Sequence, residues 1–181
     1  MVHSTSANKC LKHLTIAAAY PECFSPLPTD ADLVGILSHV RYEIEQCFII
    51  PKHHEHDWHL KESVFLAILI HARVLLAFFE STDRRLDDVL CSDFGFPSSP
   101  VSIPPDDRKR FNKDIAHLTY SRLRHTPETK PWPVFEILRP LFDRSVSFIR
   151  HILAHPPNGA DELELRNWNA LLHLLSSNKD A

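Results

Sequence analysis

The chain contains little glycine. Only Gly35, Gly95 and Gly159 occur among its 181 residues. Loops that cradle phosphates in dinucleotide-binding and Walker-type proteins need several glycines close together, because the backbone must approach the phosphate closely. The sequence therefore excludes both kinds of nucleotide site.

The chain also lacks paired cysteines. Its four cysteines are scattered, with no C-x-x-C pair, and neither cysteine nor serine stands in a pattern typical of nucleophilic catalysis. The short apolar run at residues 14–20 follows Lys9 and Lys12 and does not make a convincing export signal. These observations predict reduced thiols and a cytoplasmic protein.

Neither a strong net charge nor a membrane span is present in the sequence. The formal net charge is −3, so any contact with nucleic acid must come from a local basic patch. The longest apolar run, residues 64–79, carries His71 and Arg73 at its centre, which makes it shorter and more polar than a typical span. It is typical of the central helix of a bundle, and we expect no membrane association.

What the chain does have is helical periodicity interrupted by proline. No alternating strand pattern and no internal repeat occurs. Thr29 or Asp30 is expected to cap the first long helix, and Pro140 to kink the fourth or to set its effective start. The expected helices cover residues 30–50, 57–82, 106–124, 133–155 and 161–175. The pattern predicts an all-α, up-and-down bundle of four to five helices, with a single domain at 29–181 and an irregular N-terminal segment or short docking helix at 1–28.

The third predicted helix gathers the most chemistry. At about 100° per residue, one side of it is apolar and should face the core, with Phe111, Ile115, Leu118 and Leu123. The other side is a single polar arc of Arg110, Lys113, Asp114, His117, Ser121 and Arg124. Cations beside an imidazole and a hydroxyl are suited to holding a phosphate and moving a proton next to it.

Two interpretations of this arc stand side by side. In the functional one, His117 acts as general base or acid on a ribose 2′-hydroxyl or on the leaving oxygen, without a metal ion. Arg110 and Lys113 would then stabilise the phosphate charge in the transition state, and Ser121 would orient the substrate. In the structural one, the pairs Arg110–Asp114 and Asp114–His117 belong to an ordinary solvated helix face.

The stretch from Asn112 to His117, Asn-Lys-Asp-Ile-Ala-His, resembles the motif helix of HEPN domains. In that family an arginine is followed by a polar residue and then by a histidine, with four to six residues between the arginine and the histidine. Here six residues separate Arg110 from His117, and Phe111 occupies the position where the family often has its arginine. The context, with residues 71–79, 87–90 and 93–94, resembles members from abortive-infection and toxin–antitoxin loci.

The resemblance implies RNA as substrate and a homodimer in which two motif helices face one cleft, or a pairing with an antitoxin or other protein partner. It implies catalysis by Arg110 and His117 with no cofactor. The substrate contacts that we expect are Asn112, Lys113, Ser121, Arg124 and Arg73. The leading prediction is a metal-independent endoribonuclease or RNA-binding component of a defence or toxin–antitoxin system. The alternative with the same fold is a non-catalytic interaction or immunity protein.

Histidine abundance offers a different alternative, a metal-binding helical bundle enzyme. His39, His59 and either His151 or His155 would meet on different helices. The dense group of His53, His54, His56 and His59 has the simpler interpretation of a solvated turn.

The two polar residues of the long apolar run, His71 and Arg73, have structural interpretations as well. We expect a partner for the buried His71 imidazole. Arg73 should either pair with a carboxylate or contact phosphate beside the motif helix. The candidate carboxylates are Glu43, Glu45 and Asp143.

Overall fold

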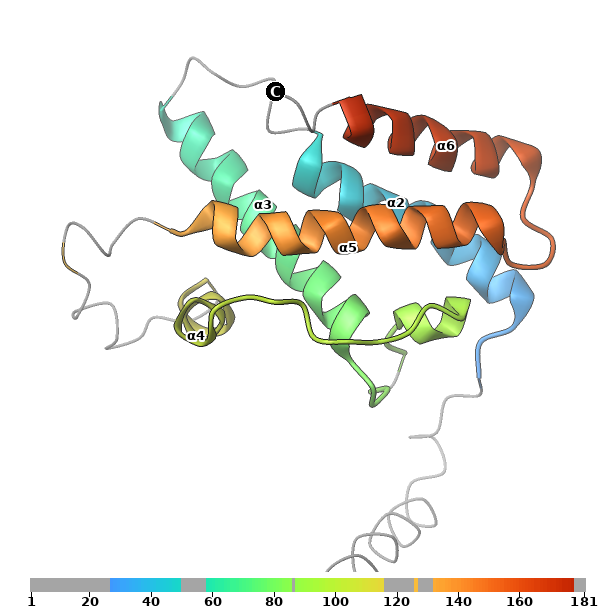
Figure 1. The fold of residues 1–181 in the computed structure, drawn as a ribbon, viewed down its shortest axis with the longest axis horizontal. Helices are drawn as coiled ribbons and strands as arrows, with labels where there is room; N and C mark the ends of the chain where they lie inside the picture. Colours follow the sequence, from blue (N-terminus) through green and yellow to red (C-terminus); the bar gives the residue numbers. More distant parts are fainter. Residues whose placement is uncertain (1–26, 50–57, 86, 116–125, 127–131, 178–181) are drawn as a thin grey trace, which may run out of the picture.

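The computed structural model describes residues 27–49, 58–85, 87–115, 126 and 132–177 (Figure 1). Within these residues there are five α-helices, one short 3₁₀ turn and no strand. The elements are α2 (Asp30–Phe48), α3 (Trp58–Glu80), η3 (Cys91–Phe94), α4 (Pro105–Asp114), α5 (Val134–Ala154) and α6 (Glu162–Ser177). The predicted all-α class is confirmed.

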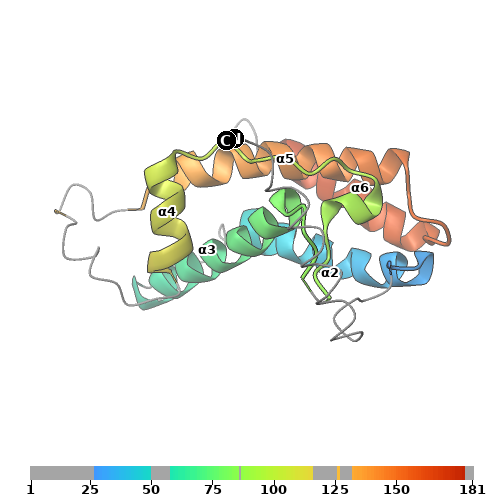
Figure 2. The same ribbon diagram turned by 90° about the horizontal axis from the view of Figure 1, so that it is seen from below.

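The four long helices form two antiparallel pairs, and α4 crosses them. Figure 1 shows α2 beside α3 and α5 beside α6, with each pair running in opposite directions. In that view α4 is seen end-on, below the start of α5, and Figure 2 shows it lying across the bundle. The predicted N-terminal segment lies outside the described residues except for Leu27 and Pro28, which have no helical structure.

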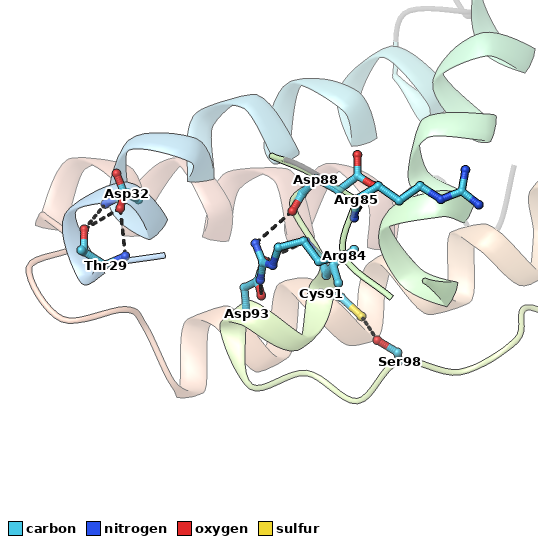
Figure 3. Close-up of polar contacts among 9 residues, drawn as sticks. Thr29, Asp32, Arg84, Arg85, Asp88, Cys91, Asp93 and Ser98 are labelled. Carbon is cyan, nitrogen blue, oxygen red and sulfur yellow. Dashed lines mark hydrogen bonds and ion pairs between the residues drawn. The ribbon is translucent and has the colours of Figure 1, made fainter. Parts of the chain in front are cut away.

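A capping box starts α2. The Asp32 amide donates to the Thr29 hydroxyl at 3.2 Å, and the Thr29 amide donates to the Asp32 carboxylate at 2.9 Å (Figure 3). Because the Thr29 hydroxyl and amide both donate to this carboxylate, the pKa of Asp32 lies below its ordinary value. Of the two residues predicted as N-caps, Thr29 is the one that caps α2.

An aromatic cluster joins the two helix pairs. Phe148 of α5 makes edge-to-face contacts with Phe78 and Phe79 of α3 and with Trp168 of α6, at centroid separations of 5.1, 5.8 and 6.0 Å. The 81–104 connection is anchored in the same core through five buried side chains: Cys91, Phe94, Phe96, Val101 and Ile103.

The structure corrects one predicted helix start and describes only the first part of the third predicted helix. Pro140 lies inside α5, which already begins at Val134, so this proline does not set the start of the helix. The third predicted helix is described only as far as Asp114, and residues 116–125 lie outside the described part.

Within the described part, α3 is the one helix long and apolar enough to cross a membrane by length and composition. One of its faces is packed into the core through Leu69, Ala72, Leu75 and Phe79. This packing is that of a core helix.

Candidate functional site

The start of α4 is fixed to the end of α3 by a bidentate ion pair. The two terminal nitrogens of Arg108 donate to the Glu80 carboxylate at 2.5 and 2.8 Å, and one of them also donates to the Val101 carbonyl at 2.6 Å. Glu80 in turn accepts the Val101 amide at 2.6 Å. Hydrogen bonds to Glu80 raise the pKa of Arg108 despite its partial burial. Arg108 is therefore a structural cation.

Two residues further along, Arg110 has a different environment. Its guanidinium carbon lies 4.3 Å from the centroid of the Trp132 indole, which precedes α5, and the side chain is half-buried. A cation over an aromatic face is attracted by the ring quadrupole. The stacking fixes the orientation of the guanidinium beside α4.

The remaining side chains of α4 divide as the helical period predicts. Phe111 is completely buried, and Ile115 is half-buried against the same core. Lys109, Asn112 and Lys113 are exposed. The burial of Phe111 means that the position where HEPN domains often have an arginine serves the core here.

Several predicted site residues cannot be placed. His117, Ser121 and Arg124 lie outside the described residues, and so does the side chain of Asp114. Of the predicted site, α4 carries Arg110, Asn112 and Lys113. Arg110 and Lys113 share one side of the helix, and Asn112 lies about 160° around the helix from Arg110.

The partners predicted for the two polar residues of α3, His71 and Arg73, are partly right. The His71 ring nitrogen Nδ1 lies 2.7 Å from the Glu43 carboxylate, and Tyr42 packs edge-on against the imidazole. This confirms that His71 has a polar partner. Arg73 is exposed, and no ion pair is recorded for it within the described part of the chain.

The three carboxylates predicted for Arg73 have other partners: Glu43 pairs with His71, Glu45 with Arg41, and Asp143 with Arg139. The prediction of a carboxylate partner for Arg73 is therefore wrong among the described residues. Arg73 and Glu80 are seven residues apart and so share a face of α3, the face to which α4 is anchored.

Metal-ligating side chains do not converge among the residues that the structure describes, where no group of three or more histidine, cysteine or acidic residues is suitably placed. His151 and His155 are neighbours with ring centroids 5.1 Å apart, and His151 Nε2 lies 2.8 Å from the Phe94 carbonyl oxygen. The turn with His53, His54 and His56 lies outside the described residues, as does the side chain of His59.

The thiols in the described residues are buried. Burial raises the pKa of the Cys47 thiol far above its ordinary value and also raises the pKa of Cys91. Cys91 additionally contacts the Ser98 hydroxyl at 3.4 Å (Figure 3). Thiols held in the protonated form are poor nucleophiles and weak metal ligands.

Sequence reasoning missed two contacts that shape this site, the Arg108–Glu80 pair and the Trp132 indole under Arg110. The signal for the second was weak but present, because Trp132 stands between Pro131 and Pro133. A rigid aromatic residue directly before a helix is suited to supporting a side chain from a neighbouring element.

Fold and site together define an all-α helical bundle crossed at one end by α4, which has acidic residues in its first turn and Lys109, Arg110 and Lys113 further along. No protein-family model matches the chain, and no curated protein or solved structure matches it either. The HEPN resemblance therefore rests on the residues of α4 and of the segment that follows it.

Proposed function

We propose that this protein binds RNA through α4 and residues 115–124 and cleaves it without a metal ion. One observation supports the proposal most directly. Arg110 is held by Trp132 on the same helix that exposes Asn112 and Lys113, immediately before His117 in the sequence. Arg110 and Lys113 are three residues apart and so share one side of α4, where a held guanidinium and an ammonium group are suited to binding a phosphodiester.

The proposed reaction is an internal phosphoryl transfer. His117 removes the proton of a ribose 2′-hydroxyl, whose oxygen attacks the adjacent phosphorus atom. The bond from phosphorus to the 5′-oxygen breaks, and that oxygen takes up a proton. Arg110 donates hydrogen bonds to the phosphate oxygens as their charge increases, and Lys113 adds a second cation. Asn112, Ser121, Arg124 and Arg73 are proposed to contact the RNA on either side.

The biological setting is proposed from the resemblance to HEPN domains. We place the protein in the cytoplasm as a component of a defence or toxin–antitoxin system, acting as a homodimer or with a protein partner. The structure offers a surface that is compatible with such pairing: Leu66, Ile70 and Val74 of α3 form an exposed apolar row, with exposed fractions of 49, 52 and 46%. Arg73 lies on the same face of the helix.

The same apolar row favours a second candidate function, a non-catalytic interaction or immunity protein. Three large aliphatic side chains, spaced four residues apart on one helix, form a continuous apolar strip of the kind that marks protein-binding surfaces. In this alternative α4 is a structural cross-brace, and its lysines are solvated.

An RNA cleavage assay in the presence of a chelator separates the candidates. We expect cleavage by the native chain, a loss of about 10²–10⁴-fold in His117→Ala, and about 10²–10³-fold in Arg110→Ala. Trp132→Leu should lose less, because the guanidinium remains but is no longer held. Arg150→Ala, an exposed arginine on α5, is the matched control and should retain full activity.

Each outcome assigns the function differently. Cleavage that persists in His117→Ala contradicts the catalytic assignment. Cleavage that the chelator abolishes points instead to the metal-dependent alternative. No cleavage by the native chain, combined with a change of mass in solution on Ile70→Asp, supports the interaction protein.

A further inference from the structure

An open groove runs along α2 on the side that faces the end of α3 and the following 84–93 segment. It consists of two hollows of about 410 and 560 Å³. Both are lined by Ile36, His39, Asp87 and Val89, so they are continuous. Together they extend from Pro28 to Glu43, which corresponds to about 22 Å along the helix.

The end of the groove nearest Glu43 combines an apolar floor with an acidic border. Val40 and Phe78 are among the apolar residues that line it, and no lysine or arginine does so within the described residues. Its carboxylates are Glu43, Asp87 and Asp88. This end is therefore complementary to an apolar ligand that carries positive charge.

At the other end of the groove two carboxylates have partners within the fold. Arg84 forms an ion pair with Asp93, and the carboxylate of Asp32 accepts the hydrogen bonds of the α2 capping box (Figure 3). Asp87 borders both hollows, and Glu43 lies beside His71. The groove is nevertheless more acidic toward Glu43, because Arg84 lines only the other end.

Gly35 lies in the lining of the larger hollow. A Cβ atom built at this position meets nothing within 4 Å, so the packing of the bundle does not require a glycine here. Glycine in a helix interior is unfavourable relative to alanine. The glycine at position 35 does, however, permit another segment of chain to approach the backbone of α2 closely.

We propose that residues 9–20 of the same chain occupy this groove. The segment reads Lys-Cys-Leu-Lys-His-Leu-Thr-Ile-Ala-Ala-Ala-Tyr, and the first 21 residues contain no aspartate or glutamate. It therefore supplies apolar groups that can cover the apolar floor of the groove and positive charge that can meet its carboxylates. Pro28, near the start of the described chain, itself lines the larger hollow, so the segment is tethered at the groove entrance.

Length and tether determine the orientation. Residues 9–20 span about 18 Å as a helix, and residues 21–26 reach up to about 20 Å, which lets the chain turn back along α2. The alanines at 17–19 then lie over Gly35, while Lys9 and Lys12 reach the acidic end. Because the segment is tethered, its effective concentration at the groove is high, and modest contacts suffice to hold it there.

Disulfide trapping in the full-length chain tests this placement. His39 is exposed and lines both hollows. It lies one turn of α2 before Glu43, at the end of the groove where the proposal places Cys10. In a Cys23→Ser background, His39→Cys should form an intramolecular disulfide with Cys10 at least about tenfold faster than Ser147→Cys, an exposed control position on α5. Cys47 and Cys91 are buried and do not compete.

Two further variants separate docking from chance encounter. Lys9→Glu with Lys12→Glu should reduce trapping at position 39 to the control rate, because like charges then meet at the acidic border. Gly35→Leu should do the same by filling the floor of the groove. Loss of trapping in both variants supports the proposal.

Three results would overturn it. Equal rates at positions 39 and 147 mean that the segment does not prefer the groove. Disulfides between chains in place of those within a chain assign the groove to a second copy. Trapping that is unchanged in the Lys9→Glu, Lys12→Glu variant removes the charge argument. None of these outcomes depends on RNA cleavage, so the proposal is independent of the proposed function.

Discussion

Two surfaces of this bundle differ in charge. Beyond its acidic first turn, α4 exposes Lys109 and Lys113 and stacks Arg110 on an indole, whereas carboxylates border the groove along α2. A formal net charge of −3 conceals this separation. The comparison shows that the charges which matter for partners are set by the local surface: α4 suits a polyanion, and the groove suits a cationic segment.

The two surfaces also differ in how they are built. The cationic helix is short and would be marginal alone, so it depends on Phe111 in the core and on the Arg108–Glu80 pair. The groove, by contrast, is an unfilled space beside α2, which is long and well capped. We therefore expect substitutions at α4 to cost stability, and a small filling substitution in the groove to add it.

The largest effect is expected for Phe111→Ala. Removing a completely buried phenylalanine side chain should lower the free energy of unfolding by about 3–5 kcal/mol. Denaturant unfolding measures the loss, and hydrogen exchange should show it first in the amides of α4. Phe135→Ala is the matched control, because Phe135 is 69% exposed, and it should change stability by less than about 0.5 kcal/mol. Equal losses in the two variants would contradict the anchoring role of Phe111.

A smaller loss is expected for Glu80→Gln, which keeps the shape of the side chain and removes its charge. The pair with Arg108 is partly exposed, with side-chain exposed fractions of 28 and 20%, so we expect a loss of about 1–2 kcal/mol. Asp143→Asn, which breaks the exposed Arg139 pair, should cost less than about 0.5 kcal/mol. If the two losses are equal in denaturant unfolding, the Arg108–Glu80 pair does not hold α4 in place.

Sequence reasoning predicted the features that depend on neighbouring residues. The helical period placed Phe111 and Ile115 toward the core, and the cap at Thr29 follows from its position before an apolar helical pattern. A polar partner for His71 was also expected, because a histidine within a long apolar run needs one. Glu43, which is that partner, had been predicted for Arg73 instead.

Contacts between distant parts of the chain could not be predicted in the same way. Arg108 and Glu80 are 28 residues apart, and Arg110 meets Trp132 only because α4 crosses the start of α5. Sequence reasoning predicted that Arg110 acts in catalysis, and that Arg73 either contacts phosphate or pairs with a carboxylate. The structure distinguishes them, since one is stacked and half-buried and the other is exposed.

The smallest effect, and the one of opposite sign, is expected for Gly35→Ala. A Cβ at position 35 has open space, and alanine is the better helix former, so the free energy of unfolding should rise by about 0.5–1 kcal/mol. The measurement belongs in the Lys9→Glu, Lys12→Glu background, where docking of the N-terminal segment cannot mask the gain. Gly95→Ala is the matched control: with φ at +71° it should destabilise, because a side chain is strained in the left-handed region. A gain at position 35 would show that the fold is more stable with alanine there, so the advantage of glycine must come from what lies over α2. If the free energy of unfolding does not rise, the described bundle itself accounts for the glycine at position 35. The contrast between a tightly packed α4 and an unfilled groove would then not hold.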